Sequence, residues 1–234
     1  MTSQYMPERG DALSVDPDVY DRRYFLDDCE GHREFLASGG GQISRRLSIA
    51  LESAEIGQGM RVLDIGCGRG ESLTWSADKG ALAWGIDYAP EAINLTRETL
   101  RHRRTTLQGR CLAAQANARN LPFASASFDR VLMLDVVEHL YPWELDAALD
   151  EVWRVLKPGG TLIVHTAPNI WYYRMGYPLF RLFQRLQGVI LPRDPRRRHR
   201  YHFVHVNEQS PTGLWRTLGR KGFWVRMRIA DVQE

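Results

Sequence analysis

Three ionisable side chains follow an apolar run in the stretch LDVVEHL, which covers residues 134–140. Asp135, Glu138 and His139 stand in an i, i+3, i+4 relation, so on one helical turn they would share a face. Such groups can take a proton from a reacting hydroxyl, and three together can ligate a divalent cation. The alternative is a helix cap followed by a solvated first turn. The surrounding elements must decide between these interpretations.

Three glycines in the stretch VLDIGCGRG, residues 62–70, form a second candidate site. Gly66, Gly68 and Gly70 stand between an apolar run and a helical pattern, where missing side chains let the backbone approach a ligand closely. The stretch lacks a GK[ST] ending, which disfavours a P-loop, and its GxGxG spacing differs from the GxGxxG of dinucleotide sites. Asp64, directly before the glycines, favours a ligand with positive charge.

An acidic residue ends the next apolar run. Asp87 closes residues 81–87, and a carboxylate at such a strand end can accept hydrogen bonds from the hydroxyls of a ribose. A ligand that combines a ribose, a carboxylate and positive charge is S-adenosylmethionine. The sequence therefore predicts that this ligand binds between the first, second and fourth strands.

Strand and helix patterns alternate from residue 43 to residue 169. Five apolar runs predict strands, and residues 224–229 (WVRMRI) predict a sixth. The predicted fold class is α/β, a Rossmann-like, doubly wound, mostly parallel sheet of six or seven strands flanked by helices, with a helical and aromatic insertion after strand five. Helices are expected over residues 43–56, after the glycines, from Pro90, from Pro142 to Leu156, and from Pro211 with Ser210 as its cap.

Five stretches, in this order along roughly residues 45–170, resemble the signatures of class I S-adenosylmethionine-dependent methyltransferases. The resemblance is to the small-molecule group that includes quinone-biosynthesis enzymes. VLDIGCGRG resembles the cofactor loop, GIDYAPEAI the ribose-binding strand end, and QANARNLPF the segment that meets adenine. SFDRVLMLDVVEHL and LKPGGTLIV resemble the fourth and fifth strands. The resemblance implies an enzyme that uses S-adenosylmethionine.

The same resemblance assigns residues to the cofactor. It implies that Asn117, with Ala118 beside it, meets the adenine amino group. The predicted cofactor-binding set is Asp64, Gly66, Cys67, Gly68, Gly70, Asp87, Tyr88, Asn117, Ala118 and Leu134.

LDVVEHL also resembles the acid-x-x-Glu-His motif that binds a divalent ion in quinone O-methyltransferases and in small-RNA terminal 2′-O-methyltransferases. The first position of that motif is typically Glu, whereas Asp135 is one methylene shorter. A further ligand would come from His205 or His165. Three hypotheses stay open. Asp135, Glu138, His139 and His205 could hold a divalent metal. Asp135, Glu138 and His139 could be catalytic, with His139 as the base with or without a metal. In the third, Asp135 contacts the cofactor or caps the turn, and Glu138 and His139 face solvent.

Residues 170–205 form an aromatic and then basic insertion, which we expect to act as a lid over the acceptor. Within it, RDPRRRHR (193–200) carries five arginines against one aspartate. This run fits an anionic or lipid-like acceptor, peripheral contact with an anionic membrane surface, or simply a solvated charge run. Residues 1–40 are predicted to be an N-terminal arm and cap segment, flexible over the first 20, before a methyltransferase domain over 41–234. Tyr20 and Tyr24 resemble aromatics that cover the cofactor in relatives.

Composition is that of a soluble globular protein, with 44% hydrophobic residues, 25% charged residues and a net charge of +3. Cys29, Cys67 and Cys111 show no paired spacing, and the N-terminus lacks a secretory pattern, so a cytoplasmic location is expected. The small net charge makes nucleic acid a poor partner. The oligomeric state is left open. So is the fate of a seventh strand, which could be lost by truncation, supplied otherwise or naturally missing.

We therefore predict an S-adenosylmethionine-dependent methyltransferase that acts on a small-molecule acceptor, with a hydroxyl oxygen preferred over nitrogen or carbon. Two alternatives stay open. One is an RNA 2′-O-methyltransferase, and the other is a non-catalytic protein that binds S-adenosylmethionine.

Overall fold

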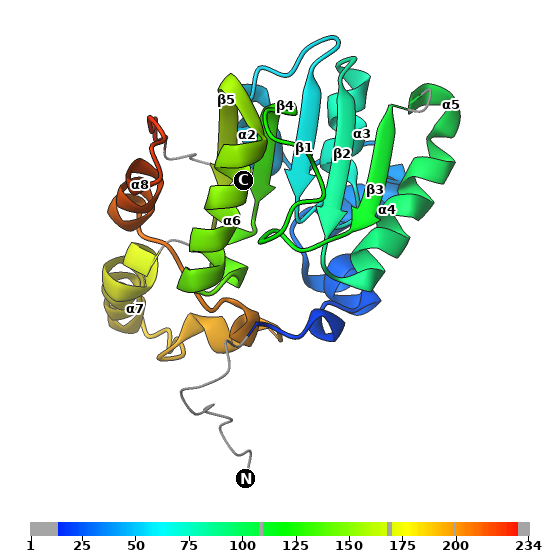
Figure 1. Cartoon of the computed structure of the whole chain (residues 1–234). Helices are drawn as coiled ribbons and strands as arrows, with labels where there is room; N and C mark the ends of the chain where they lie inside the picture. Colours follow the sequence, from blue (N-terminus) through cyan, green and yellow to red (C-terminus); the bar gives the residue numbers. More distant parts are fainter. Residues whose placement is uncertain (1–13, 108–109, 168–169, 199, 229–234) are drawn as a thin grey trace.

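The computed structural model describes residues 14–107, 110–167, 170–198 and 200–228. Its centre is a sheet of five parallel strands in the order β3-β2-β1-β4-β5 (Figure 1). The strand order reverses between β1 and β4, and in such sheets ligands bind beyond the carboxyl ends of the strands at this point. The strands are β1 (Arg61–Ile65), β2 (Leu82–Asp87), β3 (Cys111–Gln115), β4 (Phe128–Leu134) and β5 (Leu156–His165).

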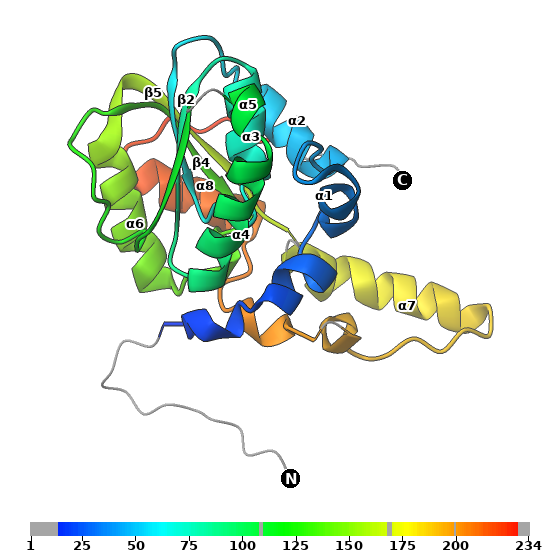
Figure 2. The same cartoon turned by 90° about the vertical axis from the view of Figure 1, so that its right-hand side faces the viewer.

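Helices cover both faces of the sheet (Figure 2). α6 and α8 lie on one face, and α2, α3 and α4 lie on the other. The predicted cap and start of α8 are confirmed, because the Ser210 hydroxyl accepts a hydrogen bond from the Gly213 N–H and Pro211 is the first helical residue. The bounds are α2 (Arg45–Ser53), α3 (Glu71–Asp78), α4 (Pro90–His102), α5 (Arg104–Leu107), α6 (Pro142–Val155) and α8 (Pro211–Arg220).

The core follows the alternation of side chains along the central strands. Leu63 and Val131 point to the face covered by α6 and α8, where they join the largest apolar cluster. Val62 and Leu132, one residue away in each strand, point to the opposite face and pack with Leu51 of α2. Because both faces are buried, these strands read as continuous apolar runs. The predicted mostly parallel, helix-flanked sheet is thus confirmed.

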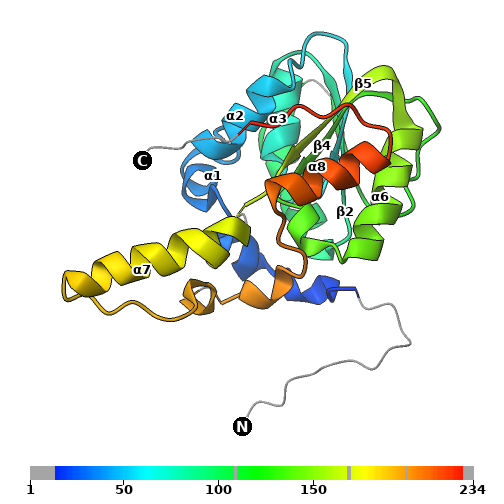
Figure 3. The same ribbon diagram turned by 90° about the vertical axis from the view of Figure 1, so that its left-hand side faces the viewer.

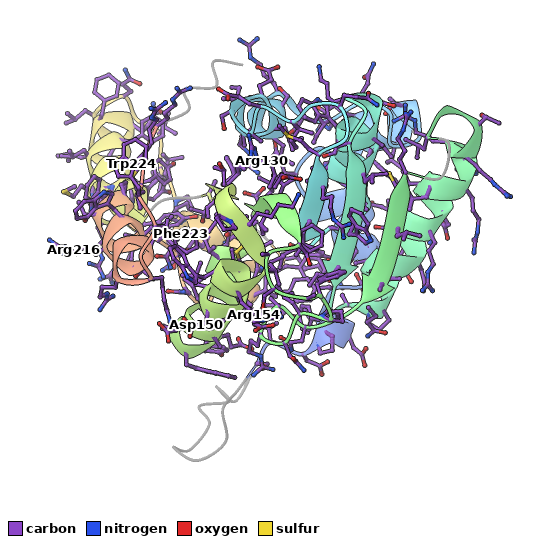
Figure 4. All side chains as sticks on the ribbon, turned by 45° about the horizontal axis from the view of Figure 1, so that its top comes forward. Arg130, Asp150, Arg154, Arg216, Phe223 and Trp224 are labelled. Atoms are coloured by element: carbon purple, nitrogen blue, oxygen red, sulfur yellow. The ribbon has the colours of Figure 1, made fainter. Side chains whose placement is uncertain are left out.

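The sheet has five strands among the described residues, so the prediction of six or seven is wrong. Residues 224–228 are extended but pair with no strand. Phe223 and Val225 contact the core, and the Phe223 ring meets Trp153 of α6 edge-on at 5.0 Å, whereas Trp224 is exposed (Figure 4). Alternating burial is a property that this segment shares with a strand, but a strand also needs a backbone partner. Residues 157–160 (KPGG) are part of β5.

From residue 14 onward, the N-terminal segment packs against α4 and the residues directly before that helix. It forms 3₁₀ turns at Pro17–Val19, a π-helical turn at Tyr24–Asp28 and α1 at His32–Ser38. Tyr20 and Phe25 are buried beside α4. The prediction of a flexible arm fails for residues 14–20, and its first 13 positions lie outside the described residues.

The insertion after β5 contains a π-helical turn (Tyr172–Gly176), α7 (Tyr177–Leu186) and 3₁₀ turns at Pro195–Arg198 and His202–Val204. Figures 2 and 3 show α7 extending away from the sheet on the side where the N-terminal segment lies. In the described part of the chain, no helix is both long and apolar enough to cross a bilayer.

Candidate active site

A cavity of about 400 Å³ lies at the carboxyl ends of β1, β2 and β4, under the N-terminal segment. Every predicted cofactor-binding residue lines it except Gly70. Of the three residues in LDVVEHL, Asp135 and His139 line the cavity and Glu138 does not. The fold therefore brings the glycine loop and part of the ionisable trio to one chamber.

The loop after β1 turns tightly toward β2. The N–H groups of Gly66 and Cys67 both donate to the Ile86 carbonyl, at 2.8 and 3.0 Å. Gly66 has φ of 76°, and a Cβ there would lie 2.5 Å from Cγ2 of Val136. Only glycine fits this position, because both the backbone conformation and the neighbouring side chain exclude a Cβ.

Gly70 does not line the cavity. It is the N-cap of α3 with φ of 86°, and a Cβ there would lie 3.0 Å from Cγ2 of Thr96. Its side faces α4 rather than the cavity. We assign it to packing of the loop, while Gly66 and Gly68 line the chamber.

Gly66→Ala is expected to lower the free energy of unfolding by about 3 kcal/mol, the sum of a left-handed residue with a Cβ and an overpacked contact. Urea denaturation measures this. Gly57→Ala is the matched control, since no atom lies within 4 Å of its added Cβ. Adding Val136→Ala to Gly66→Ala should recover part of the loss. Equal stability of Gly66→Ala and wild type would contradict the strain.

Two buried carboxylates flank the loop. Asp87 accepts hydrogen bonds from the Gly68 N–H at 3.1 Å and the Ala89 N–H at 2.9 Å, and burial raises its pKa to about 6. Asp64 accepts from the Ser72 hydroxyl, and burial raises its pKa to about 7. A charged carboxylate here is incompletely compensated, so the chamber favours a cationic ligand.

Asp135 is not on a helical turn. Its φ is 54°, and its N–H donates to the His165 carbonyl at 2.9 Å, which holds it at the end of β4. Arg46 Nη2 lies 2.7 Å from Oδ2 of Asp135, and Nδ1 of His165 lies 2.7 Å from Oδ1. Both carboxylate oxygens are therefore held by side chains from α2 and β5.

His139 ends the 3₁₀ turn Val137–His139 and meets the N-terminal segment. Its Nδ1 lies 3.0 Å from the Tyr20 hydroxyl. The ring of His205 approaches edge-on, with 4.8 Å between centroids. Burial, and next the neighbouring His205, lower the pKa of His139 to about 3, so the ring is neutral at pH 7.

Glu138 points into the protein. It is 1% exposed, its Oε2 accepts from the Thr166 hydroxyl at 3.0 Å, and its backbone carbonyl accepts from the Asn207 N–H at 3.0 Å. Burial raises its pKa, and the charge of Asp135 raises it further. The prediction that the trio shares one helical face is wrong, because the left-handed residue at Asp135 breaks the helical spacing.

The candidate metal ligands do not converge on one point, because the left-handed residue at Asp135 separates their side chains. His205 stands beside His139, His165 beside Asp135, and Glu138 behind them. Within the described ranges, no group of three or more His, Cys, Asp or Glu side chains is arranged to hold a metal ion.

Asn117 lies at the far side of the chamber with Ala118. Its Oδ1 accepts from both the backbone N–H and Nε of Arg119, at 3.0 and 3.1 Å. An adenine amino group would have to share that oxygen, so the amide nitrogen is the better candidate for a contact with the ring.

Sequence reasoning missed the tie between the glycine loop and the N-terminal segment. Arg69 is 3% exposed, and its Nη1 donates to the Phe25 carbonyl at 2.7 Å. Its Nη2 pairs with Glu71 at 2.7 Å. Arg46 was missed as well. No local pattern signals either role, because Phe25 and Asp135, the residues that these arginines tie to the site, are distant from them in the sequence.

Comparison with known proteins gives the family. Residues 63–164 match the methyltransferase domain family. Methyltransferase GfsG of Streptomyces halstedii is 33% identical over 130 residues, which are 55% of this chain and 44% of that protein. A solved S-adenosylmethionine-dependent methyltransferase from Methanosarcina mazei is 26% identical, with a TM-score of 0.56 over 76% of this chain and 86% of that one. Residues 63–164 form a class I S-adenosylmethionine-dependent methyltransferase domain.

The match to the curated relatives is partial in length. The fatty-acid O-methyltransferase of Mycolicibacterium smegmatis is 39% identical over 105 residues, 44% of this chain and 35% of that protein. The methyltransferase domain thus spans about a third to a half of these two relatives. Outside this domain, the described segment from Ser14 to Leu47 contributes residues to the cavity wall, whereas none of the described residues of the 170–205 insertion lines the cavity.

The residues of this methyltransferase domain fit S-adenosylmethionine. Gly66 and Gly68 keep the backbone of the loop bare at the cavity wall, and burial raises the pKa of both Asp87 and Asp64. A ligand with ribose hydroxyls and positive charge supplies what both carboxylates lack.

Proposed function

We propose that this chain transfers a methyl group from S-adenosylmethionine to a hydroxyl oxygen of a small molecule. One observation carries the proposal. One cavity is lined both by Asp87, the buried carboxylate that we assign to the ribose, and by His139, an imidazole that is neutral at pH 7.

Asp87 would accept from the ribose, and Asp64 would face the positive end of the cofactor. Gly66 and Gly68 would allow its close approach. S-adenosylmethionine supplies a methyl group on a positively charged sulfur, an electrophile that needs alignment more than activation. The Arg69 guanidinium donates to the Phe25 carbonyl and so ties the N-terminal segment to the glycine loop, where this segment would limit the access of water to the reacting atoms.

The acceptor hydroxyl must lose its proton as its oxygen takes the methyl group. The Tyr20 hydroxyl and Nδ1 of His139 form a hydrogen-bonded pair at the cavity wall. His139 would receive the proton, directly or by way of Tyr20. The charge of Asp135 favours the imidazolium that results. Glu138, behind the turn, is a positioning residue that holds Thr166 and Asn207 in place.

The apolar wall of the chamber favours an acceptor whose body is apolar. The chamber wall contributed by the N-terminal segment includes Val15, Pro17 and Phe25, and Leu140 follows the 3₁₀ turn. The fatty-acid O-methyltransferase among the relatives has, by its name, an apolar acceptor, and this supports a lipid-like small molecule for this chain.

Titration calorimetry with S-adenosylmethionine and S-adenosylhomocysteine tests the cofactor first. Transfer of labelled methyl to a panel of phenols, fatty acids and sugar alcohols then tests the acceptor. Cofactor binding without transfer to any member of the panel, alongside transfer to RNA, would favour the 2′-O-methyltransferase alternative. Absence of cofactor binding would overturn the proposal.

Cofactor binding is expected to release protons near pH 6.5. The cation would lower the raised pKa values of Asp64 (about 7) and Asp87 (about 6), so both carboxylates ionise on binding. Because binding releases protons, affinity should rise as pH increases from 5 to about 7.5 and then level off. Calorimetry in buffers of different ionisation enthalpy measures the release.

Asp64→Asn is the control for this proton release. It keeps an oxygen that can accept from Ser72 and cannot ionise, so it should reduce the protons released near pH 6.5. A binding enthalpy that does not depend on the buffer at this pH would contradict the assignment of both carboxylates to the cofactor.

A further inference from the structure

α7 carries an apolar face that no described part of the chain covers. Leu179 is 68% exposed, Leu186 is 80% exposed, and Ile190, just beyond the helix, is 91% exposed. Trp171 and Tyr172 are also exposed directly before it. The other exposed apolar side chains of this surface are Met175, Phe180, Leu182, Phe183 and Val189.

The helix separates these side chains from its charges. At about 100° per residue, the α7 residues Leu179, Leu182, Phe183 and Leu186 fall within an arc of about 100°. Arg181 and Arg185 fall on the other side of the helix, within an arc of about 40°. The arginine side is also the side that contacts the returning chain, where Nε of Arg181 donates to the Leu191 carbonyl at 3.2 Å.

The chain around α7 carries mostly positive charge. No Asp or Glu occurs in residues 166–193, which contain four arginines. The next seven residues add four more arginines and a single acid, Asp194. Asp194 is already paired with Arg196 at 3.0 Å, and Arg196 also meets Glu208. The long arginine stems can keep their charges in the headgroup region while the apolar face is buried.

We propose that α7, with its flanking turns, is a docking surface for a membrane leaflet that contains anionic phospholipid. An amphipathic helix with apolar and aromatic residues on one face and arginines on the other lies in the plane of such a surface. Trp171 and Tyr172 are the residue types that prefer the headgroup level. A protein groove would satisfy the apolar face, but it would not by itself account for the surplus of arginines.

The position of α7 allows docking without rearrangement of the domain. Figures 2 and 3 show the helix extending beyond the sheet and its flanking helices, so its apolar face can enter a leaflet while the sheet stays in water. The chain returns from this surface to the site, where the Tyr201 hydroxyl donates to Asp21 at 3.0 Å and Val204 packs near Tyr20. An acceptor drawn from the membrane would therefore arrive close to the chamber. Docking itself does not depend on the proposed methyl transfer.

Vesicle flotation tests the docking surface, with the full chain and two kinds of vesicle. One is phosphatidylcholine alone, and the other contains about one-third phosphatidylglycerol. We expect binding to the anionic vesicles that is at least about tenfold stronger and that weakens as salt increases. The variant Leu179→Asp/Leu186→Asp should lose at least about tenfold of this binding. Arg174→Gln/Arg185→Gln should bind both kinds of vesicle about equally.

Leu36→Asp is the matched control, since Leu36 is an exposed leucine of α1 outside this surface. It should bind vesicles as the wild type does. Affinity for S-adenosylhomocysteine, measured on every variant, separates a docking defect from a folding defect and from failure of the proposed cofactor site. Equal vesicle binding by wild type and Leu179→Asp/Leu186→Asp would overturn the proposal. A second result would also overturn it. This is a wild type that binds no vesicles but self-associates in analytical ultracentrifugation, with the self-association lost in Leu179→Asp/Leu186→Asp.

Discussion

Asp87→Ala is expected to weaken binding of S-adenosylhomocysteine by about a hundredfold or more. The carboxylate would accept both ribose hydroxyls, and each hydrogen bond to a charged group is worth about 1.5–3 kcal/mol. The same side chain accepts from the N–H groups of Gly68 and Ala89, so its loss also loosens the loop that faces the ligand. Titration calorimetry at pH 8, where wild-type Asp87 is ionised, measures the effect.

A matched aspartate and a conservative change separate charge from folding. Asp146→Ala removes an exposed aspartate of α6 that pairs only with Lys221, and should leave affinity unchanged. Asp87→Asn keeps one acceptor oxygen and no charge, so it should bind with intermediate affinity, and it should unfold at a lower temperature than the wild type, because only one of the Gly68 and Ala89 N–H groups can still donate to it. Undiminished binding by Asp87→Ala would remove Asp87 from the cofactor site.

Tyr20→Phe and His139→Asn are each expected to slow methyl transfer by about 100- to 1000-fold, within the range of general base catalysis. The first removes the hydroxyl that meets Nδ1, and the second keeps an acceptor atom near that position but cannot take a proton at neutral pH. If the two residues work as one relay, the double variant should be no slower than the slower single variant. Single-turnover rates with an accepted substrate from the panel measure this.

Two measurements keep the relay falsifiable. Affinity for S-adenosylhomocysteine should change less than threefold in all three variants, because neither group is assigned to the cofactor. At saturating S-adenosylmethionine, the single-turnover rate of the wild type should not fall between pH 8 and pH 5, because the pKa of His139 is lowered to about 3 and the imidazole stays unprotonated over this range. If the double variant is slowed by the product of the two single-variant factors, Tyr20 and His139 act separately, and this result would contradict the relay.

Local signals in the sequence were strong for the cofactor half of the site. Gly66, Gly68 and Asp87 were all placed in the chamber, because in a parallel sheet the residues after neighbouring strands meet at one edge. Gly70 followed the same pattern and yet faces Thr96 instead. Spacing in the sequence does not distinguish a glycine that admits a ligand from one that admits a neighbouring helix.

The acceptor half depended on contacts between distant segments. Asp135, Glu138 and His139 were predicted to share a face, but the left-handed backbone at Asp135 turns Glu138 inward and leaves the other two at the wall. Tyr20 was noted only as an aromatic cover, and its hydroxyl meets an imidazole 119 positions away. Such a pairing has no signature in either segment.

The sequence by itself determined the alternation of strands and helices, the parallel sheet and the glycine loop that we propose receives a cofactor, because these follow from periodicity and from residues close along the chain. Tertiary structure decided what covers that loop, which of three ionisable residues reach the chamber, and that residues 224–228 pair with no strand. It also decided that α7 turns its apolar face outward. Each of these depends on which distant segment supplies the backbone partner, the counter-charge or the covering surface, and periodicity carries no information about that choice.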